Sequence, residues 1–445
     1  MGTEPILKLI FTMSLPTMFS MLIQALYNIV DSIFVARIGD AALTAVSLAF
    51  PLQMLLMAVG IGMAVGVNSL VSRLLGQGER KQASDVATHG IMIGFISWII
   101  FLIVGFFLVK PFFAMYTAGN PNGSQIFNYG VDYGSVVMIF SFGIIFEVMI
   151  EKELQATGNM IFPMFFQLTG AITNLILDPL LIFGIGPFPR LEVKGAAVAT
   201  VAGQILAMIF AIIVITCKKH EIKISFKGFR PKLLYIKNIL AVGFPAMIMQ
   251  SIASIMVLAM NGILMQFSSS AVDVLGIYYK LQSFVFMPVF GLNQGVMPII
   301  GYNFGARNRK RLLAAMRYAL IIASSIMFVG AAVFLSIPNL LIGMFTQSAE
   351  TMRIGTVAMR IICLSFITAG ASIILTTAFQ AVGRGFTSLL ISIMRQLVLL
   401  LPLALILSQF GLNFVWAAFP ISEALSVVVA IILMLRLNRK VFSKL

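Results

Sequence analysis

The stretch KKHEIKISFKGFRPKLLYIK, residues 218–237, interrupts an otherwise apolar chain. It contains seven Lys and Arg residues, whereas only 10% of all residues in the chain are charged. On both sides of it, long apolar runs follow one another with short connections. A membrane-spanning helix needs about 20 mostly apolar residues to cross roughly 30 Å of hydrocarbon. We therefore predict that this basic segment links two groups of membrane-spanning helices.

Apolar residues dominate the composition. The hydrophobic set makes up 60% of the 445 residues, and the mean hydropathy is +1.04. Soluble domains carry about 25% charged residues because water must solvate their surface. The chain lacks such a charged surface, so most of its surface must face lipid. The composition thus excludes a soluble multidomain protein, and two cysteines are too few for a disulfide framework.

The apolar runs predict an all-α membrane protein with twelve transmembrane helices, six before the basic segment and six after it. We expect an N-terminal six-helix lobe at 1–217 that holds the cation site, a basic cytoplasmic linker at 218–237 and a C-terminal six-helix lobe at 238–445. The predicted spans are 9–36, 44–72, 87–109, 128–151, 162–183, 195–217, 239–265, 272–302, 314–337, 355–379, 386–408 and 412–435.

The basic residues also predict the orientation of the chain. With the N-terminus in the cytoplasm, the inner segments hold 22 Lys and Arg residues and the outer segments hold six. Cytoplasmic loops carry such an excess. We therefore expect a multi-pass plasma-membrane protein with both termini in the cytoplasm. The net charge of +15 then faces anionic lipid, which argues against a nucleic-acid partner.

The two halves of the sequence repeat one another. At an offset of 229 residues, GMAVGV (62–67) aligns with GLNQGV (291–296), and later QATG (155–158) aligns with QAVG (380–383) at an offset of 225. Six spans are an even number, so both halves enter the membrane from the same side, as parallel repeats about an axis along the membrane normal. Glycines four residues apart favour close helix packing. Two similar bundles with a cleft between them are typical of alternating-access transporters.

Asp31 and Asp178 are two of the acidic residues inside predicted spans, where an ionised group costs about 2.5–3.5 kcal/mol. Asp178 follows Asn174 by four residues, so both lie on one helix face, and Pro179 removes one backbone donor. Asp31 shares a face with Tyr27 and Asn28. Carboxylate and amide oxygens suit a hard cation, or a proton if the carboxylates are protonated. The alternative for Asp31 and Asp178 is a helix-end residue that faces water.

The other charges inside spans leave alternatives open. Glu147, four residues before Glu151, is explained equally well by function and by a wet interface near the inner end of its span. Lys280 either lines a cavity or extends towards the outer interface. Arg395 and Glu423 could form a structural pair between the last two spans, which is the interpretation we favour.

These residues resemble a known family, the multidrug and toxic compound extrusion (MATE) family, in its branch of small bacterial multidrug exporters. No single motif is decisive, but several occur in order on twelve spans with a six-plus-six repeat. The motifs are LP at 15–16, QxxYNxxD at 24–31, NxxxDP at 174–179, GAAxAT at 195–200 and GYNxGA at 301–306.

The resemblance implies a V-shaped pair of six-helix lobes and export driven by sodium ions or protons. The positions that match the coupling site of the family are Asp31, Asn174, Asp178 and Thr200, and Na⁺, if it is used, would be bound by the first three. Some relatives also place acidic coupling residues in the second lobe. Here the repeat positions of Asp31, Asn174 and Asp178 carry apolar residues, namely Met260, Leu399 and Leu403. Coupling should therefore be confined to the first lobe.

The predicted function is export of amphipathic, often cationic drugs or toxic compounds by antiport with Na⁺ or H⁺. The chain has no P-loop, HExxH or GxSxG motif, and His89 and His220 stand isolated, so we expect no enzyme and no cofactor. We expect a functional monomer. The alternative is a flippase for a lipid-linked saccharide, which predicts a larger basic cavity. Six residues are predicted to line the substrate pathway: Gln24, Tyr27, Asn28, Gln250, Lys280 and Gln282.

Overall fold

The computed structural model describes residues 1–117, 123–218 and 220–445, apart from the side chains of 27–29, 31–33, 36 and 40. Every regular element within these ranges is helical. The predicted coupling residue Asp31 and the predicted substrate-pathway residues Tyr27 and Asn28 lie in helix α1 (Ile6–Ala36), but their side chains are outside the described residues.

Long helices account for most of the chain, and short helical segments interrupt or extend several of them. In the first half they are α2 (Asp40–Gly76), α3 (Arg80–Ile103), η1 (Val104–Leu108), α4 (Val109–Thr117), α5 (Gly123–Ile139), α6 (Phe142–Ala156), α7 (Ile161–Phe183) and α8 (Glu192–Cys217). In the second half they are α9 (Leu233–Met265), α10 (Ser269–Gly305), α11 (Arg309–Ser336), α12 (Pro338–Gly343), α13 (Ala349–Ile362), η2 (Cys363–Ser365), α14 (Phe366–Ala381), α15 (Gly385–Ile393), η3 (Met394–Leu400), α16 (Leu401–Ser408), α17 (Leu412–Lys440) and η4 (Phe442–Lys444).

The prediction of twelve spans is confirmed. Within the described residues, 11 helices are long and apolar enough to cross a membrane, and 12 if the bent pair α5 and α6 forms one span. This pair bends by 42° in the middle of the predicted span 128–151. Gly143, just after the bend, lies against the backbone of Gln204 and Ile205, so α6 can approach α8 closely. The bend between α5 and α6 contains no proline, and it lies where α6 packs closely against α8.

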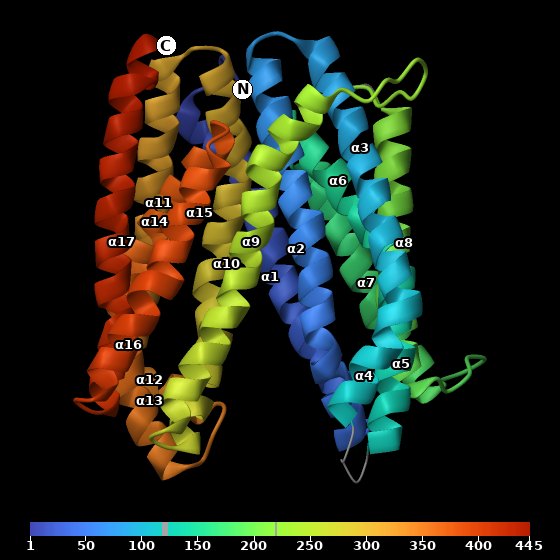
Figure 1. Cartoon of the computed structure of the whole chain (residues 1–445), viewed down its shortest axis with the longest axis vertical. Coiled ribbons are helices and arrows are strands. Elements are labelled where there is room, and N and C mark those ends of the chain that lie inside the picture. The colour runs from blue at the N-terminus through green and yellow to red at the C-terminus, as the bar shows by residue number, and fades with distance from the viewer. Residues whose placement is uncertain (118–122, 219) are drawn as a thin grey trace. The chain divides into compact units, whose positions relative to one another are not determined.

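The chain folds into two compact units. The N-terminal unit comprises Leu22–Val71 and Glu79–Met247, and the C-terminal unit comprises Met1–Met21, Ser72–Gly78 and Ile248–Leu445. The basic segment divides the sequence into repeats, whereas these units exchange the first halves of α1 and α9. Both chain ends belong to the C-terminal unit and lie at the same end of it (Figure 1).

Glycines on α2 fix one of the close helix contacts in the N-terminal unit. A side chain at Gly62 would collide with Met247 and with the backbone of Gly243 on α9. One turn further, a side chain at Gly66 would collide with the carbonyl group of Ile239. The two glycines therefore let the backbones of α2 and α9 meet, which confirms the predicted packing role.

The C-terminal unit contains the equivalent contact between α10 and α1. A side chain at Gly291 would collide with the backbone of Met18, and one at Gly295 would collide with Ser14. Gly291 and Gly295 are the repeat positions of the glycines on α2, and Ser14 and Met18 are the repeat positions of the contacted residues on α9. The sequence repeat is thus also a repeat of packing.

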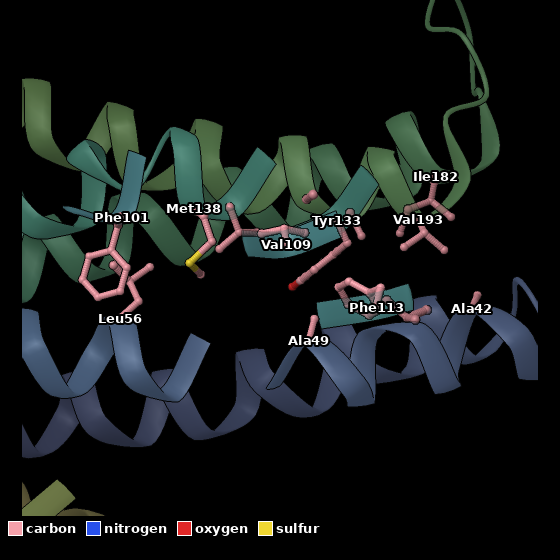
Figure 2. Packing of buried hydrophobic residues seen from close by; sticks show 14 of the residues in the cluster. Ala42, Ala49, Leu56, Phe101, Val109, Phe113, Tyr133, Met138, Ile182 and Val193 are labelled. Carbon is pink, nitrogen blue, oxygen red and sulfur yellow. The ribbon is translucent and has the colours of Figure 1, made fainter. Parts of the chain in front are cut away.

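The apolar core of the N-terminal unit packs against α2 (Figure 2). Ala42, Ala49 and Leu56 follow one another at intervals of seven residues, or about two turns, and therefore share one face of α2. Side chains from α3, α4, α5, α7 and α8 pack in the same cluster, and they include Phe101, Val109, Phe113, Tyr133, Met138, Ile182 and Val193. Small residues on α2 leave room for the larger ones opposite.

The basic segment is anchored to α3 by His89. This side chain is buried, and the backbone N–H of Lys232 donates to its Nε2 at 2.8 Å. Its Nδ1 consequently donates to the backbone carbonyl of Asp85 at 2.7 Å, and the rings of Phe229 and Tyr235 pack edge-on against it. His89 therefore has a structural role, and its partners come from a distant loop.

Candidate functional site

Three of the four predicted coupling residues meet between α7 and α8 in the N-terminal unit. The Asn174 side-chain amide donates to Asp178 Oδ1 at 3.4 Å and to Thr200 Oγ1 at 3.1 Å. Asn174 and Asp178 are 2% and 1% exposed, and Thr200 is half-buried. The alternative that Asp178 is a helix-end residue facing water is therefore wrong. The structure does not test the part that Asp31 plays, because its side chain lies outside the described residues.

Two glycines explain why these side chains meet. A side chain at Gly203 of α8 would collide with the backbone carbonyl of Gly170 on α7, so the two backbones are in contact at this point. Asn174 lies one turn after Gly170, and Thr200 lies about one turn before Gly203. The close crossing therefore places the amide of Asn174 within hydrogen-bonding distance of the Thr200 hydroxyl group.

The group presents oxygen atoms. Both hydrogen bonds of Asn174 described above use its amide nitrogen, and its Oδ1 is buried without a hydrogen-bond partner among the described residues. Pro179 lies inside α7 and has no N–H to donate to the carbonyl group of Leu175. Carboxylate, amide and hydroxyl oxygens are ligands for a hard cation, and the carboxylate can alternatively take up a proton. The chemistry of the group suits either coupling ion.

A second polar cluster lies on α6 of the same unit, and sequence analysis missed most of it. Glu151 and Lys152 are 2% and 6% exposed, and their charged groups are 3.0 Å apart. Gln155 Nε2 donates to Glu151 Oε1 at 2.7 Å, and Gln167 Nε2 of α7 donates to Glu151 Oε2 at 2.9 Å. The wet-interface interpretation is wrong, since Glu147 is also buried. Lys152 follows the predicted end of its span at residue 151, so it is one of the 22 Lys and Arg residues assigned to the inner segments, although the structure buries it.

Comparison with known proteins assigns the family. A family model described as MatE matches residues 16–180 and 245–406, one segment in each repeat. The chain belongs to the MatE family. It is similar to an FAD transporter of Shewanella oneidensis, with 28% identity over 95% of this chain and 93% of the relative. It is also similar to the multidrug export protein MepA of Staphylococcus haemolyticus, with 26% identity over 98% and 94%.

Solved structures agree with this assignment. A crystal structure of MATE in complex with MaL6 matches with a TM-score of 0.92 and 25% identity, over 99% of this chain and 98% of that one. An outward-facing multidrug resistance MATE family transporter of the MOP superfamily matches with a TM-score of 0.91 and 25% identity, over 99% and 98%. The chain is thus a multi-pass membrane transporter with the two-lobe MATE fold.

The predicted substrate-pathway residues of this MATE transporter belong to both units. Gln24 is half-buried in the N-terminal unit. In the C-terminal unit Gln250 is exposed and Gln282 is half-buried. Lys280 is exposed and its ammonium group lies 5.9 Å from the ring centroid of Phe345, beyond the short helix α12. This contact favours the interpretation that Lys280 extends towards a helix end.

The expected pairing of Arg395 with Glu423 is confirmed. Arg395 Nη1 donates to Glu423 Oε1 at 3.2 Å, in the C-terminal unit. The two side chains are 22% and 16% exposed, so they are less buried than the ion pair on α6. The pair joins the π-helical segment η3 to α17.

Proposed function

We propose that this protein is a secondary multidrug transporter that exports amphipathic, often cationic compounds by antiport with Na⁺ or H⁺. The coupling site consists of Asp31, Asn174, Asp178 and Thr200. The observation that carries this proposal is the buried carboxylate–amide–hydroxyl group between α7 and α8. The multidrug export proteins among its relatives support the class of cargo. The protein acts as a monomer in the plasma membrane, with both termini in the cytoplasm and without a cofactor.

An ion gradient supplies enough free energy for this task. Each elementary charge that moves through 100 mV yields about 2.3 kcal/mol. This corresponds to a gradient of roughly fiftyfold in the exported compound, because about 1.4 kcal/mol changes an equilibrium constant tenfold. The sequence contains no P-loop that could supply ATP-derived energy instead.

Coupling requires that cation binding changes the interactions of Asp178. As a carboxylate, Asp178 accepts the hydrogen bond from Asn174. A proton on Asp178 turns that group into a donor, and the Asn174 Oδ1 atom can accept the bond after the amide turns over. A sodium ion would draw the same oxygens inward. In both cases the link between α7 and α8 at Thr200 changes, and the affinity for a drug can change with it.

Transport by purified protein in liposomes tests the proposal. Export of a cationic dye is measured with a Na⁺ gradient alone, a pH gradient alone, and neither gradient. We expect one gradient to drive export in the wild type and the same gradient to fail with Asp178→Asn. Export that is equally fast without any gradient would contradict antiport.

An anionic nucleotide-like cargo is the second candidate, because one relative is named an FAD transporter. The same liposomes distinguish the two: export of FAD in place of the dye would favour this candidate. The flippase alternative has less support, since two cations within the described spans, Lys152 and Arg395, are ion-paired, and Lys280 is exposed beside the ring of Phe345. A cavity for pyrophosphate would need such cations to be available.

A further inference from the structure

Helix α6 carries four ionisable residues, and all four are buried. They are Glu147, Glu151, Lys152 and Glu153. Among the described residues, Lys152 is the one buried lysine of the chain. Three carboxyl groups therefore share one buried ammonium group. A buried charge without a partner is costly, so this excess of acidic groups calls for an explanation.

Glu151 is the carboxylate in direct contact with this ammonium group. It lies 3.0 Å from Lys152 Nζ, and it also accepts hydrogen bonds from Gln155 and Gln167. Lys152 Nζ in turn donates to Gln155 Oε1 at 2.8 Å. The pair of Glu151 and Lys152 is neutral as a whole and well hydrogen-bonded, so it can remain ionised inside the protein.

Glu147 is the group that this pair leaves without compensation. It precedes Glu151 by one turn on the same face of α6 and is 4% exposed. Its Oε1 atom is buried and has no hydrogen-bond partner among the described residues. An ionised Glu147 would place a second negative charge beside Glu151, with Lys152 already engaged. The carboxyl group therefore needs a proton to be buried at this place.

Among the described residues, the helices packed around α6 add no second buried cation to Lys152. On α3 the charged and titratable groups are Arg80, Lys81, Asp85 and His89, of which His89 is bound to the basic segment and the others lie nearer the start of α3. On α7 the group is Asp178, and on α8 the groups are Glu192 and Lys194 in the first turn and Cys217 in the last. The segment of α2 between residues 40 and 73 has no charged residue.

The second repeat shows that the fold does not require these charges. At the offset of 225, the positions of Glu147, Glu151 and Lys152 are occupied by Ser372, Thr376 and Thr377 on α14. Both threonine hydroxyls donate to the backbone of their own helix. A helix in the equivalent place thus packs with hydroxyl side chains only, and the ionisable residues of α6 serve something other than packing.

The α6 cluster is connected to the coupling site along α7. Gln167, which donates to Glu151, lies seven residues before Asn174. Seven residues are about two turns and about 10 Å, so both side chains point from one face of α7. Gln204 lies one turn after Thr200 on α8, and its Oε1 atom is buried without a partner among the described residues. Polar side chains thus follow the α7–α8 contact from Asn174 towards the end of α6.

We propose that Glu147 is a proton-binding site in the N-terminal unit, beside the ion pair of Glu151 and Lys152. Its carboxylate takes up one proton to become a neutral carboxyl group, and it gives the proton up towards the end at which α6 ends and α7 begins. Protons that have occupied Asp178 would leave through this site. The last step rests on the proposed function, whereas proton binding by Glu147 does not.

Infrared spectroscopy of the purified protein tests proton binding without transport. A protonated carboxyl group has a C=O stretching band that disappears on ionisation. We expect a buried carboxyl band in the wild type with a component that titrates with pH, and we expect Glu147→Gln to lose this component while the contribution of the buried Glu153 remains. Glu153→Gln is the matched control: Glu153 lies on the same helix, is fully buried and has two unpartnered oxygens, but it faces Val67 and Gly90 instead. The titrating band should persist in this control.

An unchanged titration in Glu147→Gln would overturn the proposal. If that variant does not fold, Glu147→Ser replaces it, because serine occupies the equivalent position of the second repeat. The transport step is tested in liposomes with a pH gradient, where we expect Glu147→Gln to slow export at least about tenfold and Glu153→Gln to export like the wild type. Wild-type export that ignores the pH gradient would refute proton coupling, whereas wild-type rates in Glu147→Gln would refute this exit path alone.

Discussion

The two units bury different kinds of polar side chain. In the described part of the chain, all buried residues with charged side chains belong to the N-terminal unit, namely Glu147, Glu151, Lys152, Glu153 and Asp178. The C-terminal unit buries hydroxyl and amide side chains instead, and its pair of Arg395 and Glu423 remains partly exposed. Because the units are built from two copies of one repeat, the fold itself does not require buried charge. In the proposed mechanism, these charges serve the activity of the N-terminal unit.

Helix α7 and the span at the equivalent position of the second repeat differ in the same way. In the first repeat α7 is continuous from Ile161 to Phe183 and carries Asn174 and Asp178. In the second repeat the equivalent span consists of α15, the π-helical η3 and α16, with leucines at both polar positions. The continuous helix α7 keeps Asn174 and Asp178 one turn apart on the same face. In the second repeat the π-helical segment η3 lies at the equivalent place. The comparison predicts that substitutions in the two units have different consequences.

The largest effect is expected from removal of the coupling carboxylates. Asp178→Asn and Asp31→Asn should each abolish gradient-driven export, because the amide keeps the shape of the side chain but cannot take up a proton or compensate a cation. The measurement is dye export from liposomes, with circular dichroism as a check of folding. Leu403→Asn, at the equivalent position of the C-terminal unit, is the control and should retain export. Wild-type rates in both aspartate variants would show that the two units do not differ in coupling.

The next effect concerns stability. Lys152→Met leaves Glu151 as a buried charge without its cation, which should cost about 3–5 kcal/mol in the free energy of unfolding. The double variant with Glu151→Gln removes both charges and should recover most of this loss. Thermal unfolding in detergent compares the variants. A single variant as stable as the wild type would mean that the pair is not buried in the folded protein.

A smaller effect is expected on the cargo. Replacement of Gln250 or Lys280 by alanine should alter the apparent affinity or the preference among drugs, but not the ion that drives export. Neither side chain can hold a cation with a carboxylate in the C-terminal unit. Export of several drugs is measured under both gradients. A changed ion dependence at constant drug affinity would contradict coupling by the N-terminal unit alone.

The smallest effect is expected for Arg395→Met. Its partner Glu423 and its own side chain keep some exposure, so loss of this ion pair should cost about 1–3 kcal/mol. This loss should be clearly smaller than that of Lys152→Met in the same thermal assay. A loss of equal size would remove the distinction between buried and partly exposed ion pairs in the two units.

The sequence predicted the features that depend on short spacings. The apolar runs predicted the spans, the glycine motifs predicted the repeat, and the four-residue spacing of Asn174 and Asp178 placed them on one helix face. The bend between α5 and α6 was not predictable, since it contains no proline and depends on the approach of Gly143 to α8. Such breaks are determined by neighbouring helices.

The α6 cluster and the role of His89 were missed for a related reason. Lys152 follows the end of the predicted apolar run, which is typical of a cytoplasmic charge, but α6 continues to Ala156 and Lys152 is buried in the structure. His89 has partners that are more than a hundred residues away. One signal was available for α6. The positions of the second repeat that are equivalent to Glu147, Glu151 and Lys152 carry uncharged residues, namely Ser372, Thr376 and Thr377.

Reciprocal binding of drug and cation tests the central claim most directly. Affinity of the purified wild-type protein for a cationic drug is measured by fluorescence titration at two pH values, each with and without Na⁺. The account predicts that one of the cations weakens drug binding, that the drug weakens binding of that cation by the same factor, and that Asp178→Asn removes this dependence. Drug affinity that neither cation changes would contradict coupling through the N-terminal unit.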